Sequence, residues 1–373
     1  MRIPFHKPYF SEAERRYLLA ALEEGYWGGG RWVAHLEAYL KSLYGREVVL
    51  VSSGTAALHL ALALLLGDKG GEVIVPTWTF TATAAAVVHA GGSPVLADVG
   101  PSLHLTAETV EAVRTPRTRG VVVVHYAGVP APMEELMTLC ERHGWWLVED
   151  ACHALPAWYA GKLCGTFGSA AVLSFHATKP IAAGQGGALL LESAELAQRA
   201  RLLRRNGLYR PLDAPWDYTV EALGWNYMPS DFQAAVALAQ AERLLAVRAQ
   251  RRHLAEAYAQ QLKGEELIQL YPFHEPSSSA YHLLPAFIQG LRVESRKALF
   301  HWMREEGVEL ALHYKPLHLQ PAYRAFWRPG QSFPQAEAIW PTIFSLPLWP
   351  GLSTEAVEFV TSRLKAWVRQ APL

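Results

Sequence analysis

The sequence predicts an α/β protein in which a mostly parallel sheet lies between two layers of helices. From Val48 to Glu192, short apolar runs bounded by turn residues alternate with segments of helical character, and this pattern is typical of parallel strands buried on both faces. The chain has 373 residues, of which 51% are hydrophobic, so it can form a large domain and a smaller one. We place a three-layer α/β/α domain at residues 1–245 and a smaller α+β domain at residues 246–373.

The first element is a helix expected at residues 11–24. Ser11 is positioned to cap its first turn, and Glu14, three residues later, completes a capping box. Gly25 is suited to the left-handed conformation that ends many helices. Beyond it, the alternating pattern predicts strands at 48–51, 72–76, 94–99, 120–124, 145–150, 170–175 and 186–192, with helices at 55–66, 79–91 and 133–144.

The last third of the chain reads differently. The alanine-rich stretch 231–262 is predicted to be helical and to connect the sheet to the smaller domain. A strand-like segment at 283–290 and helices at 296–307 and 354–368 give the smaller domain its α+β character.

Composition and charge exclude several classes of partner. Lys and Arg together number 34, and so do Asp and Glu, so no charge surplus favours nucleic acid or an anionic membrane surface. The N-terminus lacks the apolar core of a signal peptide, and no apolar run reaches the length of a membrane span. We therefore expect a cytoplasmic protein with neither nucleic acid nor a membrane as its partner.

Neither a disulfide framework nor a metal site is predicted. Cys140, Cys152 and Cys164 form no CxxC pair, and we interpret them as buried small side chains. His313 and His318 come closest to the spacing of metal ligands, but a proline lies between them.

The candidate functional residues directly follow the apolar runs, because ligands bind α/β sheets at the carboxyl ends of the strands. The turn 52–55 opens a helix whose backbone N–H groups favour a phosphate, although an ordinary helix cap would explain it equally well. Glu149 and Asp150 end a strand, where a carboxylate orients a cationic ring nitrogen or caps a helix. Lys179 follows the next strand, and a lone lysine is usually a solvated amine.

Taken together, these three features match the chemistry of pyridoxal phosphate. A phosphate cradle anchors this cofactor, an acid keeps its ring nitrogen protonated so that the ring accepts electrons, and a lysine binds it covalently. A lysine among small and apolar groups also loses its proton more readily than a lysine in water. The sequence therefore predicts that Lys179 is a nucleophile.

Several segments, in a fixed order along nearly the whole chain, also resemble one protein family. Among them are SSGTAALHLAL, EVIVPTWTFTATA, WLVEDACHA, GTFGSAAVLSFHATKPIAAGQGGALLL, GWNYMPSDFQAAVALAQAERL and FSLPLWPGLS. They resemble the DegT/StrS family of sugar aminotransferases, which are fold type I pyridoxal phosphate enzymes. The resemblance implies transfer of an amino group from an amino acid, expected to be glutamate, to a keto group, expected at C4, of a nucleotide-linked deoxysugar. Such a reaction serves deoxyaminosugar biosynthesis, as for cell-surface polysaccharides.

The resemblance also assigns roles to residues. Lys179 and Asp150 are the catalytic candidates, the first bound to the cofactor and the second paired with its ring nitrogen. Phe80 stands where the family places a ring that stacks on the cofactor, with Trp78 as the alternative, and His153 is expected near the 3-hydroxyl group. The other cofactor-binding positions it implies are Ser53, Gly54, Thr55, Ala56, Ser174, His176 and Asn226.

Asn226 matches an asparagine that reaches the phosphate from a partner subunit, so the resemblance implies a homodimer with shared active sites. Two positions depart from the family: Met228 replaces the usual cation, and Gln185 replaces the usual glutamate. Both bear on the substrate rather than on the cofactor chemistry. Donors for a substrate diphosphate must then lie elsewhere, and the substrate candidates are Arg31, Arg210, His313, Tyr314 and Lys315.

Alternatives within and beyond this chemistry stay open. The acceptor could be a keto-inositol, which the loss of the cation at position 228 mildly favours, or a 3-keto sugar nucleotide. A sugar dehydratase of the same fold is disfavoured, because those relatives carry histidine in place of the lysine. A regulatory protein that binds pyridoxal phosphate is a further alternative, although such a protein would be expected to lose Lys179 or Asp150.

Overall fold

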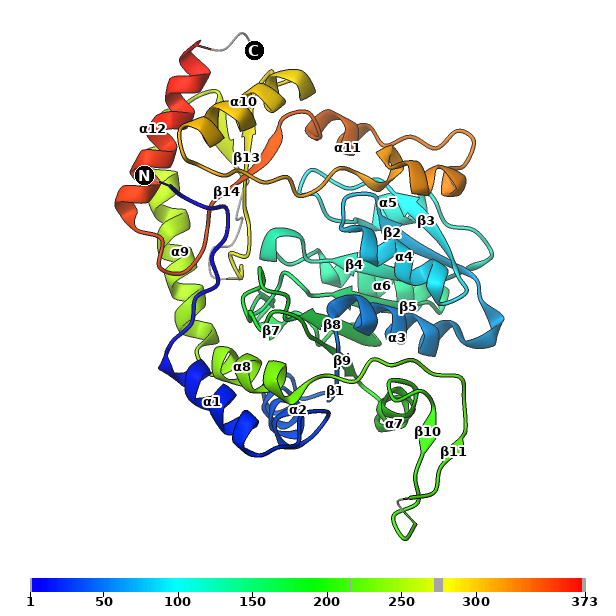
Figure 1. Cartoon of the computed structure of the whole chain (residues 1–373). Helices are drawn as coiled ribbons and strands as arrows, with labels where there is room; N and C mark the ends of the chain where they lie inside the picture. Colours follow the sequence, from blue (N-terminus) through cyan, green and yellow to red (C-terminus); the bar gives the residue numbers. More distant parts are fainter. Residues whose placement is uncertain (1, 215, 272–277, 371–373) are drawn as a thin grey trace.

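The computed structural model describes residues 2–214, 216–271 and 278–370. Its main element is a seven-stranded sheet with the strand order β1-β9-β8-β5-β4-β2-β3 (Figure 1). All strands run parallel except β9, which is antiparallel to both of its neighbours. The predicted mostly parallel sheet is therefore confirmed. The strands are β1 (Glu47–Val51), β2 (Glu72–Pro76), β3 (Ser93–Ala97), β4 (Thr118–Val124), β5 (Trp146–Asp150), β8 (Ala170–Ser174) and β9 (Gly187–Leu191).

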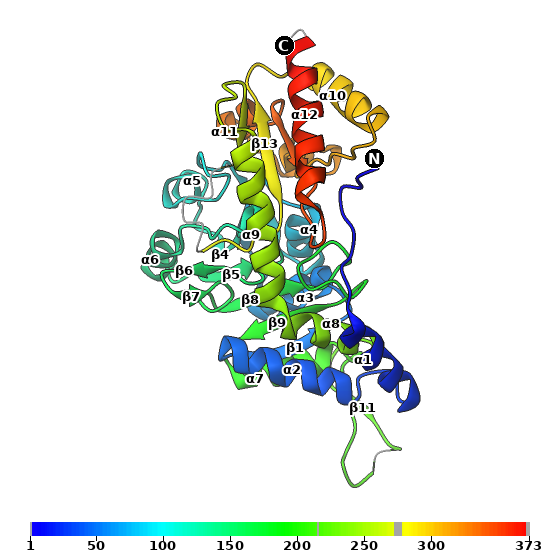
Figure 2. The same cartoon turned by 90° about the vertical axis from the view of Figure 1, so that its left-hand side faces the viewer.

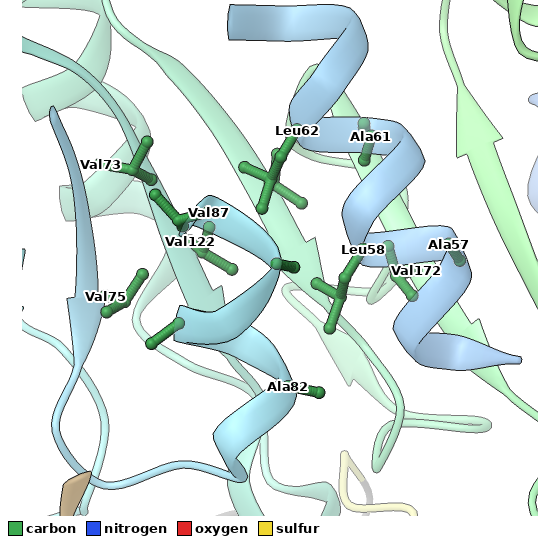
Figure 3. Packing of buried hydrophobic residues seen from close by; sticks show 14 of the residues in the cluster. Ala57, Leu58, Ala61, Leu62, Val73, Val75, Ala82, Val87, Val122 and Val172 are labelled. Atoms are coloured by element: carbon green, nitrogen blue, oxygen red, sulfur yellow. The ribbon is translucent and has the colours of Figure 1, made fainter. Parts of the chain in front are cut away.

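Helices cover both faces of this sheet, as the continuous apolar strands require. In β1, Val49 and Val51 pack into one hydrophobic cluster while Val48 and Leu50 pack into another, because successive side chains point to opposite faces. The first face carries α3 (Gly54–Leu66) and α4 (Thr81–His89), whose apolar side chains lie over those of the strands (Figure 3). The second face carries α2 (Arg31–Tyr44) and α8 (Asp231–Glu242) at one end, and α5 (Ala107–Glu111) with α6 (Met133–His143) at the other.

The smaller part of the molecule contains a second, antiparallel sheet of β12 (Ile268–Leu270), β13 (Leu284–Ile288) and β14 (Ile343–Leu346). Its hydrophobic core also takes in α9 (Leu244–Gln261), α10 (Val293–Glu305) and α12 (Thr354–Gln370). Ile3 lies in this core and pairs with Val308, so the start of the chain packs with its C-terminal third. The division at residue 245 stays a prediction.

The N-terminal helix begins and ends as predicted. Helix α1 (Glu12–Glu23) has Ser11 as its N-cap, and both bonds of the capping box with Glu14 are present. Gly25 follows its end with a φ of 70°, in the left-handed region.

The stretch 231–262 is helical as predicted, but it forms two helices that meet at Arg243, whose φ and ψ of −107° and 9° are not helical. The Arg243 side chain forms an ion pair with the buried Glu14 of α1. Gln240 donates hydrogen bonds to Glu14 and to the Tyr9 carbonyl, at 2.6 and 2.7 Å. These contacts keep α8 on the large sheet, while α9 turns away toward the smaller one (Figure 2).

Several further elements were not predicted. They include α2, α7 (Ala194–Leu203) and α11 (Pro334–Ile339), together with the hairpins β6 (Trp158–Tyr159) to β7 (Lys162–Leu163) and β10 (Leu208–Tyr209) to β11 (Thr219–Val220). The β10–β11 hairpin projects from the body of the molecule (Figures 1 and 2). Within the described ranges, no helix combines the length and the apolar character needed to cross a membrane.

Candidate active site

The carboxyl ends of β1, β5 and β8 surround a cavity of about 270 Å³. Its position matches the expectation for an α/β sheet. Most of the predicted site residues line it: Ser53, Gly54, Thr55, Phe80, Asp150, His153, Ser174, His176, Lys179, His313 and Tyr314. Residues separated by more than 250 positions in the sequence thus meet around one space.

The N-terminus of α3 forms one wall of the cavity. Ser53 is its N-cap and accepts a hydrogen bond from the Ala56 N–H at 3.1 Å. A Cβ atom added to Gly54 would lie 2.9 Å from Ser174 Cβ and 3.3 Å from Cys152 Sγ, so glycine lets the helix approach β8 closely. The first N–H groups of a helix have no intrahelical acceptor, and here they border a cavity suited to a phosphate.

The acid of the cavity is Asp150, not its neighbour Glu149. Glu149 is fully buried and accepts hydrogen bonds from the N–H groups of Gly165, Phe167 and Gly168, at 2.6, 2.7 and 2.9 Å. Asp150 lines the cavity, and its Oδ2 accepts a hydrogen bond from Thr83 Oγ1 at 3.0 Å. Glu149 thus fixes the loop 165–168, while Asp150 is available to a ligand.

Lys179 lies in the loop after β8, half-buried in the cavity wall. Burial lowers the pKa of its amine, while the nearby Cys152 and Asp150 act in the opposite direction. The neutral amine is the nucleophilic form. The surroundings of Lys179 therefore favour covalent chemistry at its Nζ.

His153 and Phe80 complete the space that a planar ring would fill. His153 is buried, its Nε2 bonds to the Tyr314 hydroxyl at 3.0 Å, and its Nδ1 has no partner among the described residues. The unpartnered nitrogen fits a hydroxyl group on a bound ligand. Phe80 is 54% exposed and lines the cavity, whereas Trp78 is fully buried in the core. The residues present thus fit pyridoxal phosphate, and of the two aromatic candidates Phe80, not Trp78, lines the cavity.

The model of the DegT/DnrJ/EryC1/StrS aminotransferase family matches residues 8–365. The chain belongs to this family. As a member, it is a pyridoxal phosphate-dependent aminotransferase of fold type I, and the predictions of family, fold class, enzyme class and cofactor are confirmed.

Solved structures support this assignment over nearly the whole chain. The aminotransferase TlmJ from Streptoalloteichus hindustanus is 32% identical, with a TM-score of 0.91 and 99% of each chain covered. The PLP form of the putative sugar aminotransferase Spr1654 from Streptococcus pneumoniae is 25% identical, with a TM-score of 0.94 and 100% of each chain covered. DesI, solved with its TDP-sugar product, is 29% identical with a TM-score of 0.88, covering 99% of this chain and 93% of its own.

Some predicted residues of the aminotransferase do not line the cavity. They are Ala56, Trp78, Asn226, Arg31, Arg210 and Lys315. Arg31 pairs with Glu24 at 3.0 Å. The Arg210 guanidinium lies 5.5 Å from the ring centre of Tyr218 on the β10–β11 hairpin.

Asn226 is exposed, whereas its neighbour Tyr227 is held in place. The Tyr227 hydroxyl bonds to His59 on α3 at 2.8 Å, and its carbonyl accepts a hydrogen bond from Ser52 at 3.0 Å. The segment that carries Asn226 therefore lies next to the phosphate cradle while the asparagine itself faces outward.

The sequence prediction missed several residues in the wall of the aminotransferase's cavity, among them Thr79, Cys152 and Gln185. It also missed Thr83, which supports Asp150 from outside the cavity lining. Thr79 and Thr83 are four residues apart in TFTAT, around the start of α4, and their hydroxyls bond at 2.8 Å. That spacing was the available signal. Cys140 and Cys164 are buried as predicted, but Cys152 is half-buried and faces the cavity. Burial raises the pKa of the Cys152 thiol well above its usual value, so it is a poor nucleophile.

His313 and His318 do not converge on a common point. His313 Nδ1 bonds to Ser345 Oγ at 2.9 Å, and His318 Nδ1 bonds to Thr77 Oγ1 at 2.7 Å. Across the described part of the chain, no group of three or more His, Cys, Asp or Glu side chains could hold a metal ion.

Proposed function

We propose that the enzyme transfers an amino group from glutamate to the C4 keto group of a nucleotide-linked deoxysugar. The observation that carries the proposal is the cavity where Lys179, Asp150 and the N-terminus of α3 meet. The cavity borders the N-terminus of α3, which suits a phosphate, and it also borders a lysine of lowered pKa.

Each residue has a distinct task in this reaction. Bound pyridoxal phosphate supplies an electron sink that lets a proton leave the donor's Cα. Lys179 would hold the cofactor covalently and, once displaced, carry that proton. Asp150, oriented by Thr83, would keep the ring nitrogen protonated. Ser174 and the N-terminus of α3 would hold the phosphate, and His153 would contact the ring hydroxyl.

A nucleotide sugar is the acceptor we favour, since DesI, which shares the fold across 99% of this chain, was solved with a TDP-sugar product. The proposal includes a role in deoxyaminosugar biosynthesis in the cytoplasm. Met228 supports the second candidate, a keto-inositol, because it removes a positive charge from a position that is cationic in the family. An acceptor without a diphosphate needs fewer cationic partners.

We also propose a homodimer in which each subunit completes the other's site through Asn226. The exposed apolar side chains near Asn226 support this: Leu212, Trp216, Tyr218, Val220 and Leu223 all belong to the β10–β11 region. So large an apolar surface is expected to be covered by a partner. Sedimentation should show a dimer that loses its cofactor on dilution, and a fully active monomer would contradict the shared site.

The role of Lys179 is tested first with the purified protein. It should be yellow, and borohydride should fix the cofactor to Lys179, where mass spectrometry would locate it. Lys179→Ala should abolish the adduct. An adduct on another lysine would overturn the proposal for Lys179.

The acceptor is tested by mixing the aminated form of the enzyme with a 4-keto sugar nucleotide, a 3-keto sugar nucleotide or scyllo-inosose. The return of the visible absorbance of the bound cofactor reports turnover. Reaction with the 4-keto sugar nucleotide alone supports the proposal. Reaction with scyllo-inosose alone would replace the acceptor and leave the aminotransferase activity intact.

A further inference from the structure

Lys179 borders not only the active-site cavity but also two smaller cavities behind it. The inner one, of about 40 Å³, is lined by Lys179 with His6, His282, His313 and Leu348 among others. The outer one, of about 10 Å³, is also lined by Lys179 and His6. We call these two spaces the rear cavities.

The rear cavities lead from Lys179 toward the surface beneath the N-terminal segment. The outer cavity is also lined by Lys7, Pro8 and Tyr9, which are exposed on the outside of the molecule. Lys179 and His6 line both cavities, so both spaces lie beside these two side chains. Small spaces therefore lie between Lys179 and the exposed N-terminal segment, and the inner one also shares Thr178, His313 and Tyr314 with the active-site cavity.

The size of the rear cavities fits water. A water molecule needs about 10–15 Å³ of such space, so the inner cavity has room for about three molecules and the outer cavity for about one. Phosphate or a carboxylic acid needs considerably more than the outer cavity provides. Water is thus the ligand that both spaces accommodate.

The polarity of the rear cavities also fits water. His282, which lines the inner cavity, is 5% exposed, and its Nδ1 has no hydrogen-bond partner among the described residues. Arg251, which lines the outer cavity, is 2% exposed, and its Nε likewise has no described partner. A buried polar atom without a partner costs about 1–3 kcal/mol, and ordered water is the usual remedy.

The side chains around these atoms are fixed. Arg251 donates hydrogen bonds to the carbonyls of His282 and Leu348, at 3.0 and 2.9 Å. His6 Nε2 bonds to the Ala177 carbonyl at 2.8 Å, two residues before Lys179. The walls of the rear cavities are therefore held by hydrogen bonds, and the spaces are part of the folded structure.

The proposed reaction requires water and proton transfer at Lys179. In the first half-reaction the donor's C–N bond is replaced by a C=O bond whose oxygen comes from water. Bound cofactor would take up the nitrogen and two electrons, and Lys179 Nζ would accept the Cα proton and deliver it to the aminated cofactor. The second half-reaction releases one water. During both half-reactions the substrate fills the active-site cavity and blocks the approach of solvent through it.

We propose that the rear cavities conduct water and protons between Lys179 and solvent while substrate occupies the active-site cavity. The inference rests on the proposed function, because it requires Lys179 to be the residue that moves the proton. The borohydride experiment tests Lys179 independently: an adduct on another lysine removes both proposals, whereas an adduct on Lys179 leaves the rear cavities to be tested separately.

The test closes the inner cavity without altering its histidines. Leu348→Phe adds volume in its wall, and Leu352→Phe makes the same change in the same hydrophobic cluster but not in the lining of either rear cavity. Both proteins receive glutamate deuterated at Cα in a single half-reaction. The measured quantity is the fraction of deuterium kept in the aminated cofactor rather than lost to water.

We expect Leu348→Phe to keep a several-fold larger fraction of the deuterium than the wild type and Leu352→Phe. The Lys179 ammonium would then exchange its deuterium with fewer neighbouring waters. Equal fractions in both variants would overturn the proposal. A raised KM for glutamate with an unchanged fraction would also overturn it and would point to the donor's carboxylate as the occupant.

A second measurement does not depend on the variants or on activity. A high-resolution crystal structure of the cofactor-free wild type should show ordered water beside His282 Nδ1 and Arg251 Nε. Rear cavities without water in that structure would contradict the proposal even if Leu348→Phe fails to fold.

Discussion

The close approach of α3 to β8 makes Gly54→Ala a sharp test of the phosphate cradle. The new Cβ would lie 2.9 Å from Ser174 Cβ and 3.1 Å from Ser174 Oγ. Carbon atoms pack at 3.5–4.0 Å, so either α3 or Ser174 must shift by several tenths of an ångström. Both belong to the predicted phosphate site.

The size of the effect follows from the cost of overpacking. Inserting a methyl group into a tightly packed site costs about 1–3 kcal/mol, which corresponds to roughly 5- to 150-fold in a dissociation constant. Intrinsic helix propensity acts in the opposite sense, because Ala is favoured over Gly by up to about 1 kcal/mol inside a helix. The substitution should therefore weaken cofactor binding and lower the stability of the cofactor-free protein by no more than about 2 kcal/mol.

The assay is a titration of cofactor-free protein with pyridoxal phosphate, followed by the visible absorbance of the bound form. Thermal unfolding of the cofactor-free protein measures stability in parallel. Gly28→Ala is the matched control, since a Cβ there would meet no atom within 4 Å. Unchanged or tighter binding by Gly54→Ala would refute the role given to this contact.

Three further predictions concern the acid, a long-range helix cap and a buried histidine. Asp150→Asn should still bind cofactor but should slow a single half-reaction by orders of magnitude. Thr83→Val should slow the half-reaction less. A near-normal rate for Asp150→Asn would mean that another group keeps the ring nitrogen protonated. Asp231 accepts hydrogen bonds from the N–H groups of Gly30 and Trp32 at the start of α2. Asp231→Ala should lower the free energy of unfolding, measured by urea denaturation, by about 2–4 kcal/mol, because these N–H groups lose a charged acceptor. A change within the error of the assay would contradict the cap. His313 has its pKa lowered to about 3 by burial and by Lys179, so it stays neutral in the folded protein while the unfolded chain gains a proton below about pH 6.5. The free energy of unfolding should therefore fall as the pH drops from about 6.5, with His313 contributing up to about 1.4 kcal/mol per pH unit. If His313→Gln shows the same dependence of stability on pH, His313 is not its origin.

The residues around the cavity could be predicted because they follow strands. Lys179, Asp150 and Gly54 each come directly after an apolar run, and parallel strands bring such residues to one edge of the sheet. That argument needs only the order of strands and helices. It did not decide which of Glu149 and Asp150 is the acid of the cavity, because that choice depends on which side of the strand each carboxylate points to. The loop 165–168 supplies three N–H groups to Glu149, and no local pattern indicates that.

The elements that were missed depend on contacts between distant parts of the chain. Helix α2 has no side-chain cap of its own at Gly30, so its start carries no local signal. Its N–H groups are instead satisfied by Asp231, which accepts from Gly30 at 2.6 Å and from Trp32 at 2.9 Å. The break at Arg243 likewise depends on Glu14, far away in the sequence. Helix propensity alone would predict one continuous helix through Arg243.

The cap that Asp231 provides also sets an order of events during biosynthesis. Asp231 is made 201 residues after Gly30, which at about 5–20 residues per second is a delay of roughly 10–40 s. During that interval α2 lacks both its cap and α8, the helix that covers its apolar face. Fragments that end before Asp231 should therefore leave α2 unpaired and open to chaperones and proteases. The nascent chain completes its N-terminal layer only after two thirds of it has been translated.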